Sequence, residues 1–316
     1  MFALRGVAVS FSVFLIVYCA LSLAVCLCWR RVWLHSASRP VRRRANLLFA
    51  LRMFPLVSAA VITGAFTVPS FLLLEPRAID EPLGGIPLIL GMAGAGLGLF
   101  GGANAILVLL RTSRTVSTWT KEAQPVEAGS PVPVLRISPA VPAMTAAGIL
   151  RPRVLMSGVA EFLLTGNELQ TALNHEIEHV RRRDNLKKLL LRLVAFPGMA
   201  GLEAAWLVAI EMAADDAAVS NASEALDLAA ALIKLSRLGP AEARADLTAA
   251  LVHSPSSAMN ARVARLIAWS DARLVSSQRS SLWYGIGAAL AAVAVFAVTY
   301  GQLLVRVHTA TEWLVR

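Results

Sequence analysis

Four long apolar runs constrain this chain more than any other feature of its sequence. They cover Val7 to Trp29, a stretch within Leu47 to Leu74, Gly84 to Leu110, and Leu282 to Leu304. A helix that crosses a bilayer needs roughly 20 mostly apolar residues, and each run provides them. Apolar residues make up 57% of the chain and charged residues only 16%, whereas a soluble domain has about 25% charged residues. The sequence therefore predicts a mainly α integral membrane protein with four transmembrane helices.

The first three runs also carry local signals. The first is too long for the apolar part of a signal peptide, and Arg30 follows it closely, so we expect it to be retained. In the second run, Pro55 is expected to kink the helix or to mark its start. The third run is rich in glycine, and small residues let helices approach closely in lipid.

The distribution of arginine predicts the orientation. The net charge is +10, and arginines crowd the loop after the first run: Arg30, Arg31, Arg39, Arg42, Arg43 and Arg44. Such loops stay in the cytoplasm. The loop with Glu75 and Asp80 is then external, and the stretch that opens with Arg111 is cytoplasmic again. Because the arginines lie beside the apolar runs, positive-inside topology explains the net positive charge. We therefore expect the bilayer as a partner and no direct contact with nucleic acid.

The order of these segments predicts three parts. Residues 1–110 form a membrane domain with three transmembrane helices, and residues 282–316 form a fourth helix and a short external tail. Residues 111–281 are the only part long enough for a cytoplasmic α+β domain. Within it, the extended runs Val132 to Ser138 and Gly148 to Met156 predict a small sheet.

A helix start signal follows the extended runs. Thr165 can cap a helix, and Glu168 stands three residues further on, which is the spacing of a capping box. We expect this helix to run as far as Leu191. It carries the sequence HEIEH from His175 to His179.

HEIEH is the motif that carries chemistry. His175 and His179 are four residues apart, which places both imidazoles on one face of the helix. Such a pair can supply two of the three protein ligands of a catalytic zinc ion. Glu176 stands beside the first histidine and can act as general base towards the attacking water. The bland alternative is a charged helix face with two incidental histidines.

A third ligand is expected downstream. Glu211 can ligate zinc, and Asp215, one helical turn on, can accept a hydrogen bond from the outer nitrogen of a ligand histidine. Asp216 is the rival for that role, and an ordinary polar stripe is the alternative for the whole group. All three cysteines lie in the first apolar run, so the zinc site has to use histidine and carboxylate ligands.

The stretch 189–210 separates the two halves of this site. It is mostly apolar, but a single crossing of the membrane would put His179 and Glu211 on opposite faces, and it is too short to cross twice. We therefore expect an interfacial or re-entrant segment, kinked near Pro197 and Gly198.

Other polar residues are weaker candidates. Glu178 points off the ligand face, and we expect it to be solvated. Asp184 either pairs with the arginines at 181–183 or supports the site. His253 either contacts substrate or is incidental, and His35 and His308 receive no role.

The sequence HEIEHVRRRDN together with the later EMAAD resembles the BlaR/MecR family of membrane metallopeptidases, which are regulatory proteases of the gluzincin type. The likeness extends to Gly148 to Val154, which is similar to the strand that precedes the motif helix in that family. It extends further to the layout of three spans, a cytoplasmic peptidase domain and a fourth span.

The resemblance implies a zincin-like metallopeptidase domain, with His175, His179 and Glu211 as zinc ligands and Glu176 as catalytic base. It also implies a multi-pass protein of the bacterial inner membrane whose active site faces the cytoplasm. The family's usual substrate is a transcriptional repressor of the winged-helix type, and self-cleavage can occur. A substrate strand is expected to pair with the edge near Gly148.

The chain departs from the family's antibiotic sensors in one respect. Those proteins carry an external penicillin-binding domain after the fourth span, and we expect this chain to lack it, since it ends at Arg316. Two other functions stay open: a membrane quality-control metalloprotease, and a scaffold for signalling that has no activity. The intact Glu176 speaks against the scaffold. The oligomeric state is not indicated by the sequence.

Overall fold

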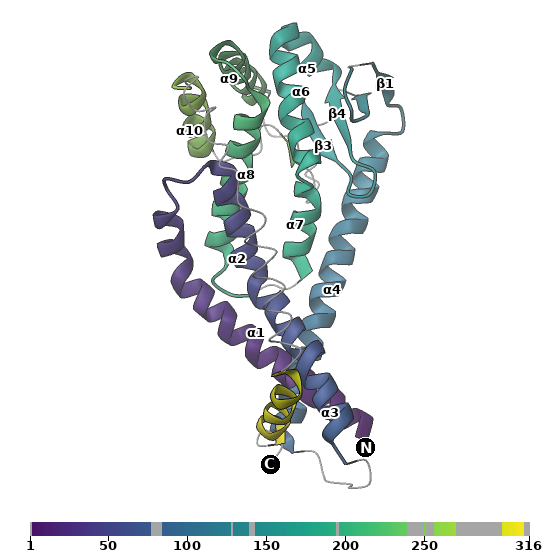
Figure 1. The fold of residues 1–316 in the computed structure, drawn as a ribbon. Coiled ribbons are helices and arrows are strands. Elements are labelled where there is room, and N and C mark those ends of the chain that lie inside the picture. The colour runs from purple at the N-terminus through teal and green to yellow at the C-terminus, as the bar shows by residue number, and fades with distance from the viewer. Residues whose placement is uncertain are drawn as a thin grey trace. The chain divides into compact units, whose positions relative to one another are not determined.

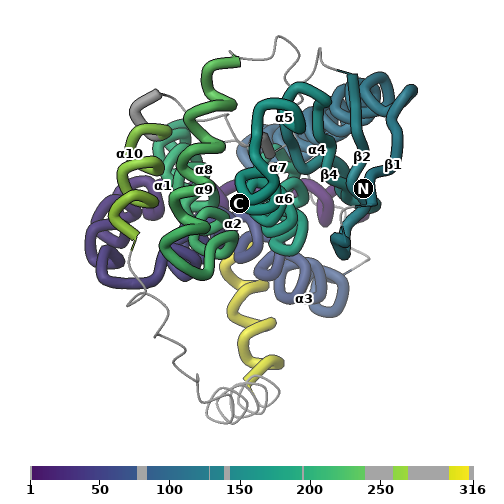
Figure 2. Tube along the Cα trace, turned by 90° about the horizontal axis from the view of Figure 1, so that it is seen from above, coloured from purple at the N-terminus to yellow at the C-terminus, as the bar shows by residue number. Residues whose placement is uncertain are grey.

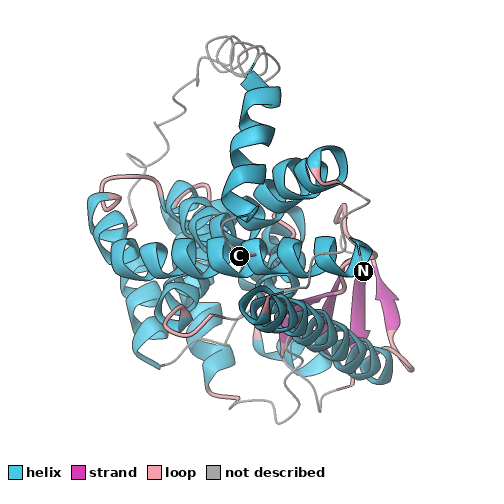
Figure 3. Ribbon diagram, turned by 90° about the horizontal axis from the view of Figure 1, so that it is seen from below, coloured by secondary structure: helices cyan, strands magenta, loops and turns pink. Residues whose placement is uncertain are grey.

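The structure is a computed structural model that describes residues 2–76, 84–127, 129–138, 143–193, 196–238, 249–250, 256–269 and 299–312. Contacts divide the chain into two compact units. The first contains Met1–Trp29, Leu51–Phe100 and Ser276–Arg316, and the second contains Arg30–Ala50 and Gly101–Val275. Most described residues are helical, and the strands gather in one place (Figure 3).

Three long helices correspond to the first three apolar runs (Figure 1). They are α1 (Phe2–His35), α2 (Val41–Ile62) and α4 (Gly85–Trp119); α2 continues without a break through the π-helical turn η1 (Thr63–Thr67) into α3 (Val68–Leu74). By length and composition, these are three candidate membrane spans. Each helix extends beyond its apolar run, because arginine in the flanks is itself a good helix former.

The fourth apolar run lies mostly outside the described residues. The structure describes a helix over residues 299–312, which includes only the end of the predicted span at 282–304. The number of transmembrane helices therefore stays a prediction for this part of the chain.

Two details of the first unit bear on the expected packing. Pro55 lies inside α2 and neither begins nor ends it, and the irregular turn comes later, at η1. A Cβ at Gly91 would lie 2.8 Å from the carbonyl oxygen of Ala8, and one at Gly94 would lie 2.5 Å from that of Phe11. These glycines let α4 approach α1 more closely than any other residue would, as expected for helices in lipid.

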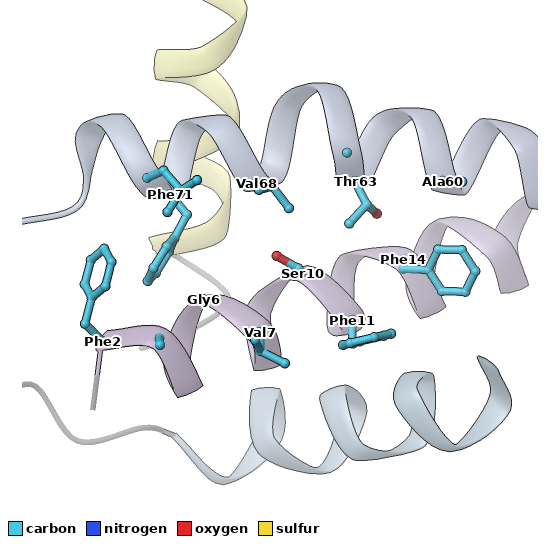
Figure 4. Close-up of a pocket in the computed structure, with 13 residues that line it drawn as sticks. Phe2, Gly6, Val7, Ser10, Phe11, Phe14, Ala60, Thr63, Val68 and Phe71 are labelled. Atoms are coloured by element: carbon cyan, nitrogen blue, oxygen red, sulfur yellow. The ribbon is translucent and has the colours of Figure 1, made fainter. Parts of the chain in front are cut away.

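The first unit also contains an apolar cavity of about 560 Å³ between α1 and the α2–η1–α3 helix (Figure 4). Aromatic rings such as Phe11 and Phe71 line it, and Ser10 and Thr63 add the hydroxyl groups visible in Figure 4. Such an apolar wall suits a segment surrounded by hydrocarbon, where polar groups are costly to expose.

The second unit contains a five-stranded sheet in the order β1-β2-β4-β3-β5. Its strands are β1 (Gln124–Val126), β2 (Val134–Ile137), β3 (Met144–Ala147), β4 (Arg153–Ser157) and β5 (Ala249–Ala250). Only β2 and β4 pair in parallel; the other neighbours are antiparallel. β2 lies within the first predicted extended run, and β4 coincides with the end of the second and extends one residue beyond it, to Ser157. The other three strands were missed, because they are short and, in β3, rich in alanine, which favours helices.

In the described part of the second unit, the helices between β4 and β5 are α5 (Gly158–Leu163), α6 (Gly166–Arg181), α7 (Asp184–Leu193), α8 (Ala200–Ala218) and α9 (Ala222–Ser236), and α10 (Ser256–Ile267) follows β5. The capping box is present: the Thr165 side chain accepts from the Glu168 amide, and the Glu168 side chain accepts from the Thr165 amide. The helix that it starts ends at Arg181 and not at Leu191. Arg183 has φ = 53°, a left-handed conformation that an α-helix cannot contain, and a separate helix, α7, starts at Asp184.

The helix α6 lies at the centre of the second unit. It packs against β3 and β4 on one side and against α8 and α9 on the other, and Figure 2 shows it between them. Its apolar residues Ala172, Leu173 and Ile177 are buried in the same core as Val154 and Leu228. This packing places the HEIEH sequence between the sheet and α8.

Candidate metal centre

The two histidines of HEIEH face each other in the interior of the second unit. His175 is completely buried and His179 is 2% exposed. Their Nε2 atoms are 3.2 Å apart. Two nitrogen lone pairs this close, one helical turn apart, are arranged to share one ion.

Glu211 comes from α8 and completes a triangle. Its Oε2 lies 3.6 Å from Nε2 of His175, and its Oε1 lies 3.5 Å from Nε2 of His179. A tetrahedral zinc ion with bonds of about 2.0–2.1 Å holds its ligand atoms about 3.3 Å from one another. The three residues therefore have the spacing that zinc requires, and among the described residues they form a buried group able to hold a metal ion.

The outer nitrogen of each histidine meets a buried carboxylate. Nδ1 of His175 lies 3.0 Å from Oδ1 of Asp215, and Nδ1 of His179 lies 2.9 Å from Oδ2 of Asp184. Each carboxylate fixes the ring so that Nε2 points at the metal position. The structure thus brings Asp215 to the expected place, and of the two alternatives for Asp184 it shows the contact with the site. Asp216, the rival, pairs instead with Arg265.

Glu176 lies beside the triangle and is completely buried. Its Oε2 accepts a hydrogen bond of 2.6 Å from the amide of Ala146 on β3, while its Oε1 has no hydrogen-bond partner among the described residues. Burial raises the pKa of Glu176, although the two histidines oppose this. A carboxylate with one anchored oxygen, one free oxygen and a raised pKa is suited to take a proton from water and to release it again.

Arg262 of α10 is the main residue that sequence reasoning missed. Its Nε and Nη2 donate to the two oxygens of Asp215 at 2.8 and 2.7 Å, and its Nη1 lies 3.1 Å from Oε2 of Glu211. The side chain is 1% exposed. One guanidinium therefore holds both α8 carboxylates in position. The sequence holds no signal for it, since Arg262 lies far from both motifs.

The charges of the site shift its pKa values in opposite directions. Burial would lower the pKa of His175, but its contacts with Asp215 and Glu211 outweigh burial and raise the pKa to about 9. Burial would raise the pKa of Glu211, but the charges of His179 and Arg262 lower it to about 2. The pKa of Asp215 is lowered, because Arg262 outweighs burial there too. Glu211, the expected third ligand, is therefore a carboxylate at neutral pH.

The strand beside the site is β3, which precedes Gly148, and not β4, which follows it. Neither strand is an edge of the sheet, because β4 lies between β2 and β3 and β3 lies between β4 and β5. The edge expected near Gly148 is therefore wrong: on its outer side β3 pairs with β5 at Thr145 and Ala146. Gly148 has φ = 92°, and a Cβ there would lie 2.7 Å from the carbonyl oxygen of Arg151. The side chain of Asn185 donates to the carbonyl oxygen of Ala146 at 3.0 Å and so ties α7 to β3.

Three other predicted residues have different outcomes. His253 lies outside the described residues. Glu178 is 8% exposed, so the expectation that it is solvated is wrong; it is packed at the end of α6. His308 lies with Glu75 and Glu312 in a half-buried group in the first unit that could hold a metal ion by spacing, but Arg5 already pairs with Glu75 at 3.0 Å.

Fold and site together define a class: a membrane-associated protein with a buried His–His–Glu group whose spacing suits a metal ion, and with an adjacent carboxylate bonded to the sheet. The chain belongs to peptidase family M48, whose model matches residues 135–313, more than half of its length. It is thus a metallopeptidase of a family that is generally zinc-dependent. No curated protein matches the chain.

Proposed function

We propose that this protein is a membrane-bound, zinc-dependent endopeptidase that cleaves a protein substrate in the cytoplasm. His175, His179 and Glu211 would hold the zinc ion, which polarises the scissile carbonyl and activates water. Glu176 takes the proton from the attacking water at its free oxygen and passes it to the leaving amine. Asp215, Asp184 and Arg262 keep the ligands in place.

One observation supports endopeptidase activity most directly. The amide of Ala146, on β3 of the sheet, donates to the catalytic carboxylate Glu176. A peptide that takes the place of β5 beside β3, where β5 pairs at Thr145 and Ala146, would therefore lie with its backbone next to Glu176 and the metal position. Pairing through the backbone fixes an extended substrate while leaving its side chains free to vary.

A segment of this chain already occupies the outer side of β3. β5 is antiparallel to β3, with Thr145 opposite Ala250 and Ala146 opposite Ala249. This pairing supports self-cleavage as part of the proposed function. In the wild-type protein we expect a fragment that begins or ends near Ala249, and none in the Glu176→Ala variant; mass spectrometry of the purified chains distinguishes the two.

We further propose that the substrate is a transcriptional repressor and that the peptidase acts in signalling. Support comes from the resemblance of HEIEHVRRRDN and EMAAD to the motifs of the BlaR/MecR family and from the segment between His179 and Glu211. In its described residues, 180–193 and 196–210, no helix is long and apolar enough to be a candidate span. Quality-control peptidases with the same motif typically have additional spans at this point.

The test compares cleaved proteins in cells that express the wild-type protein or Glu176→Ala. Signalling predicts one main substrate, a DNA-binding repressor, whose new termini appear only with the wild-type protein. Cleavage of many unfolded membrane proteins would overturn the signalling proposal in favour of quality control. If no protein differed between the two, and the purified wild-type protein also failed to cleave an unfolded substrate, the proposed endopeptidase would be wrong.

A further inference from the structure

A polar cavity of about 450 Å³ lies in the second unit, at the end of α6 away from the capping box. It is lined by residues from the start of α2, from the end of α6 and from α7: Arg42, Asn46, Glu178, Arg181, Arg182 and Lys187. Neither the peptidase chemistry nor the family match assigns a role to it. Four of its six lining residues carry a positive charge.

Arg182 is the residue in this cavity that most needs a partner. It is 8% exposed, and its Nε, Nη1 and Nη2 atoms have no hydrogen-bond partner among the described residues. Its Nε lies 3.9 Å from Oδ1 of Asp184, which is too far for a hydrogen bond. A guanidinium has five N–H donors, and leaving them unsatisfied in a buried position is costly.

The carboxylates near Arg182 are already engaged. Asp184 holds His179 with one oxygen and accepts from Lys187 Nζ at 3.0 Å with the other. Glu178, buried at the cavity wall, lies 3.8 Å from Nη1 of Arg181. Even with Asp184 included, four cationic side chains face two carboxylates in this part of the described chain. The cavity therefore has an excess of positive charge that an anion would balance.

We propose that this cavity binds a phosphate-type oxyanion, with Arg182 as the buried anchor. Arginine matches the geometry of phosphate oxygens through paired N–H donors, and a phosphate offers enough acceptors to bridge Arg182, Arg42 and Lys187. Asn46 can donate to the same group. The two sources of this chemistry are free phosphate and the headgroup of an anionic phospholipid.

The position of Arg42 gives the lipid source its support. Arg42 and Asn46 lie in the first two turns of α2, the helix that continues as a candidate membrane span. Basic side chains at that position meet the anionic headgroups of the cytoplasmic leaflet. A lipid headgroup could enter the cavity from the membrane surface beside Arg42. Binding of free phosphate would not require the cavity to lie near the membrane.

The test measures binding of inorganic phosphate to the full-length protein in neutral detergent by titration calorimetry at constant ionic strength. We expect saturable binding that weakens about tenfold or more in Arg182→Gln and in Arg42→Gln. The matched control is Arg183→Gln, which removes the same charge one residue from the anchor at an exposed position outside the cavity; its affinity should stay within about twofold of wild type. Arg42 is exposed, so its variant stays informative if loss of buried Arg182 impairs folding.

A second arm separates the two sources. The protein is reconstituted into vesicles of phosphatidylcholine alone or with phosphatidylglycerol, and the phosphate titration is repeated. Loss of phosphate binding only with phosphatidylglycerol assigns the cavity to a lipid headgroup, and equal binding in both assigns it to free phosphate. No saturable binding by the wild-type protein in detergent or in phosphatidylcholine, or equal weakening in Arg183→Gln, would overturn the proposal.

Discussion

Four buried carboxylates surround the two histidines, and their neighbours give them different tasks. Glu211 faces the inner nitrogens of both rings, whereas Asp184 and Asp215 each meet an outer nitrogen. Among the described residues, no ion pair of 4.0 Å or less joins Glu176 to either histidine ring. Glu176 is held instead by the Ala146 amide on β3. Position relative to the rings therefore separates the proposed ligand, the two proposed orienting groups and the proposed base.

The orienting carboxylates should tune metal affinity without being ligands. Asp184→Asn and Asp215→Asn keep the shape of the side chain but remove the charge that fixes each ring. We expect each to weaken zinc binding about 10–100-fold, as for other outer partners of ligand histidines, in a competition titration with a chelating dye. Asp216→Asn, which alters the partner of Arg265, should bind zinc like the wild-type protein.

Arg262 should matter for stability even before metal binds. Arg262→Met leaves Asp215 and Glu211 buried next to each other without their shared cation. Breaking a buried ion pair costs about 3–5 kcal/mol, and we expect a loss of that size in the free energy of unfolding of the metal-free protein. Arg265→Met removes a more exposed pair with Asp216 and should cost less than about 1 kcal/mol. Similar losses in both variants would contradict the assigned role.

At the scale of elements, the sequence predicted those parts that depend on local signals. The capping box fixed the start of α6, and the spacing of HEIEH placed both histidines on one face. The end of α6 depends on the backbone of Arg183, and the pairing of β3 depends on contacts distant in sequence, so neither had a local signal. Arg262 was invisible for the same reason: its partners lie about fifty residues earlier in the chain, on α8.

The capping box also makes a prediction for pH. Burial would raise the pKa of Glu168, but hydrogen bonds from Lys234 and from the Thr165 amide outweigh it and lower the pKa. A lowered pKa contributes stability above the ordinary glutamate value of about 4.3, and this contribution is lost as the pH falls through the lower folded value. Glu168→Gln should therefore reduce stability at pH 7 and flatten its decrease in acid, measured by unfolding at several pH values. An unchanged pH profile would show that Glu168 does not contribute.

At the scale of the whole molecule, the chain combines apolar helices with a unit whose proposed metal centre would need access to water and to protein substrates. The arginine-rich loop predicts that this unit lies in the cytoplasm. Ligands on α6 and α8 can share one ion only if the segment between them does not cross the membrane once. The topology of this segment therefore decides whether the proposed metal site can form.

Labelling of cysteines tests this topology. In a variant whose native cysteines are replaced by alanine, Ser220→Cys places a thiol just after α8, and Asp80→Cys places one in the loop predicted to be external. With a maleimide that cannot cross membranes, we expect labelling of position 80 in intact cells and of position 220 only after lysis. Labelling of position 220 in intact cells would put the end of α8 outside and contradict the cytoplasmic site.

The central claim is that His175, His179 and Glu211 hold a zinc ion on which peptide cleavage by Glu176 depends. The most direct measurement combines zinc content with hydrolysis of an unfolded protein, on the purified wild-type chain and on Glu176→Gln and His179→Ala. We expect about one zinc ion per chain in the wild type and in Glu176→Gln, much less in His179→Ala, and hydrolysis by the wild type alone. A wild-type chain that cleaves without zinc, or a Glu176→Gln variant with full activity, would contradict the account.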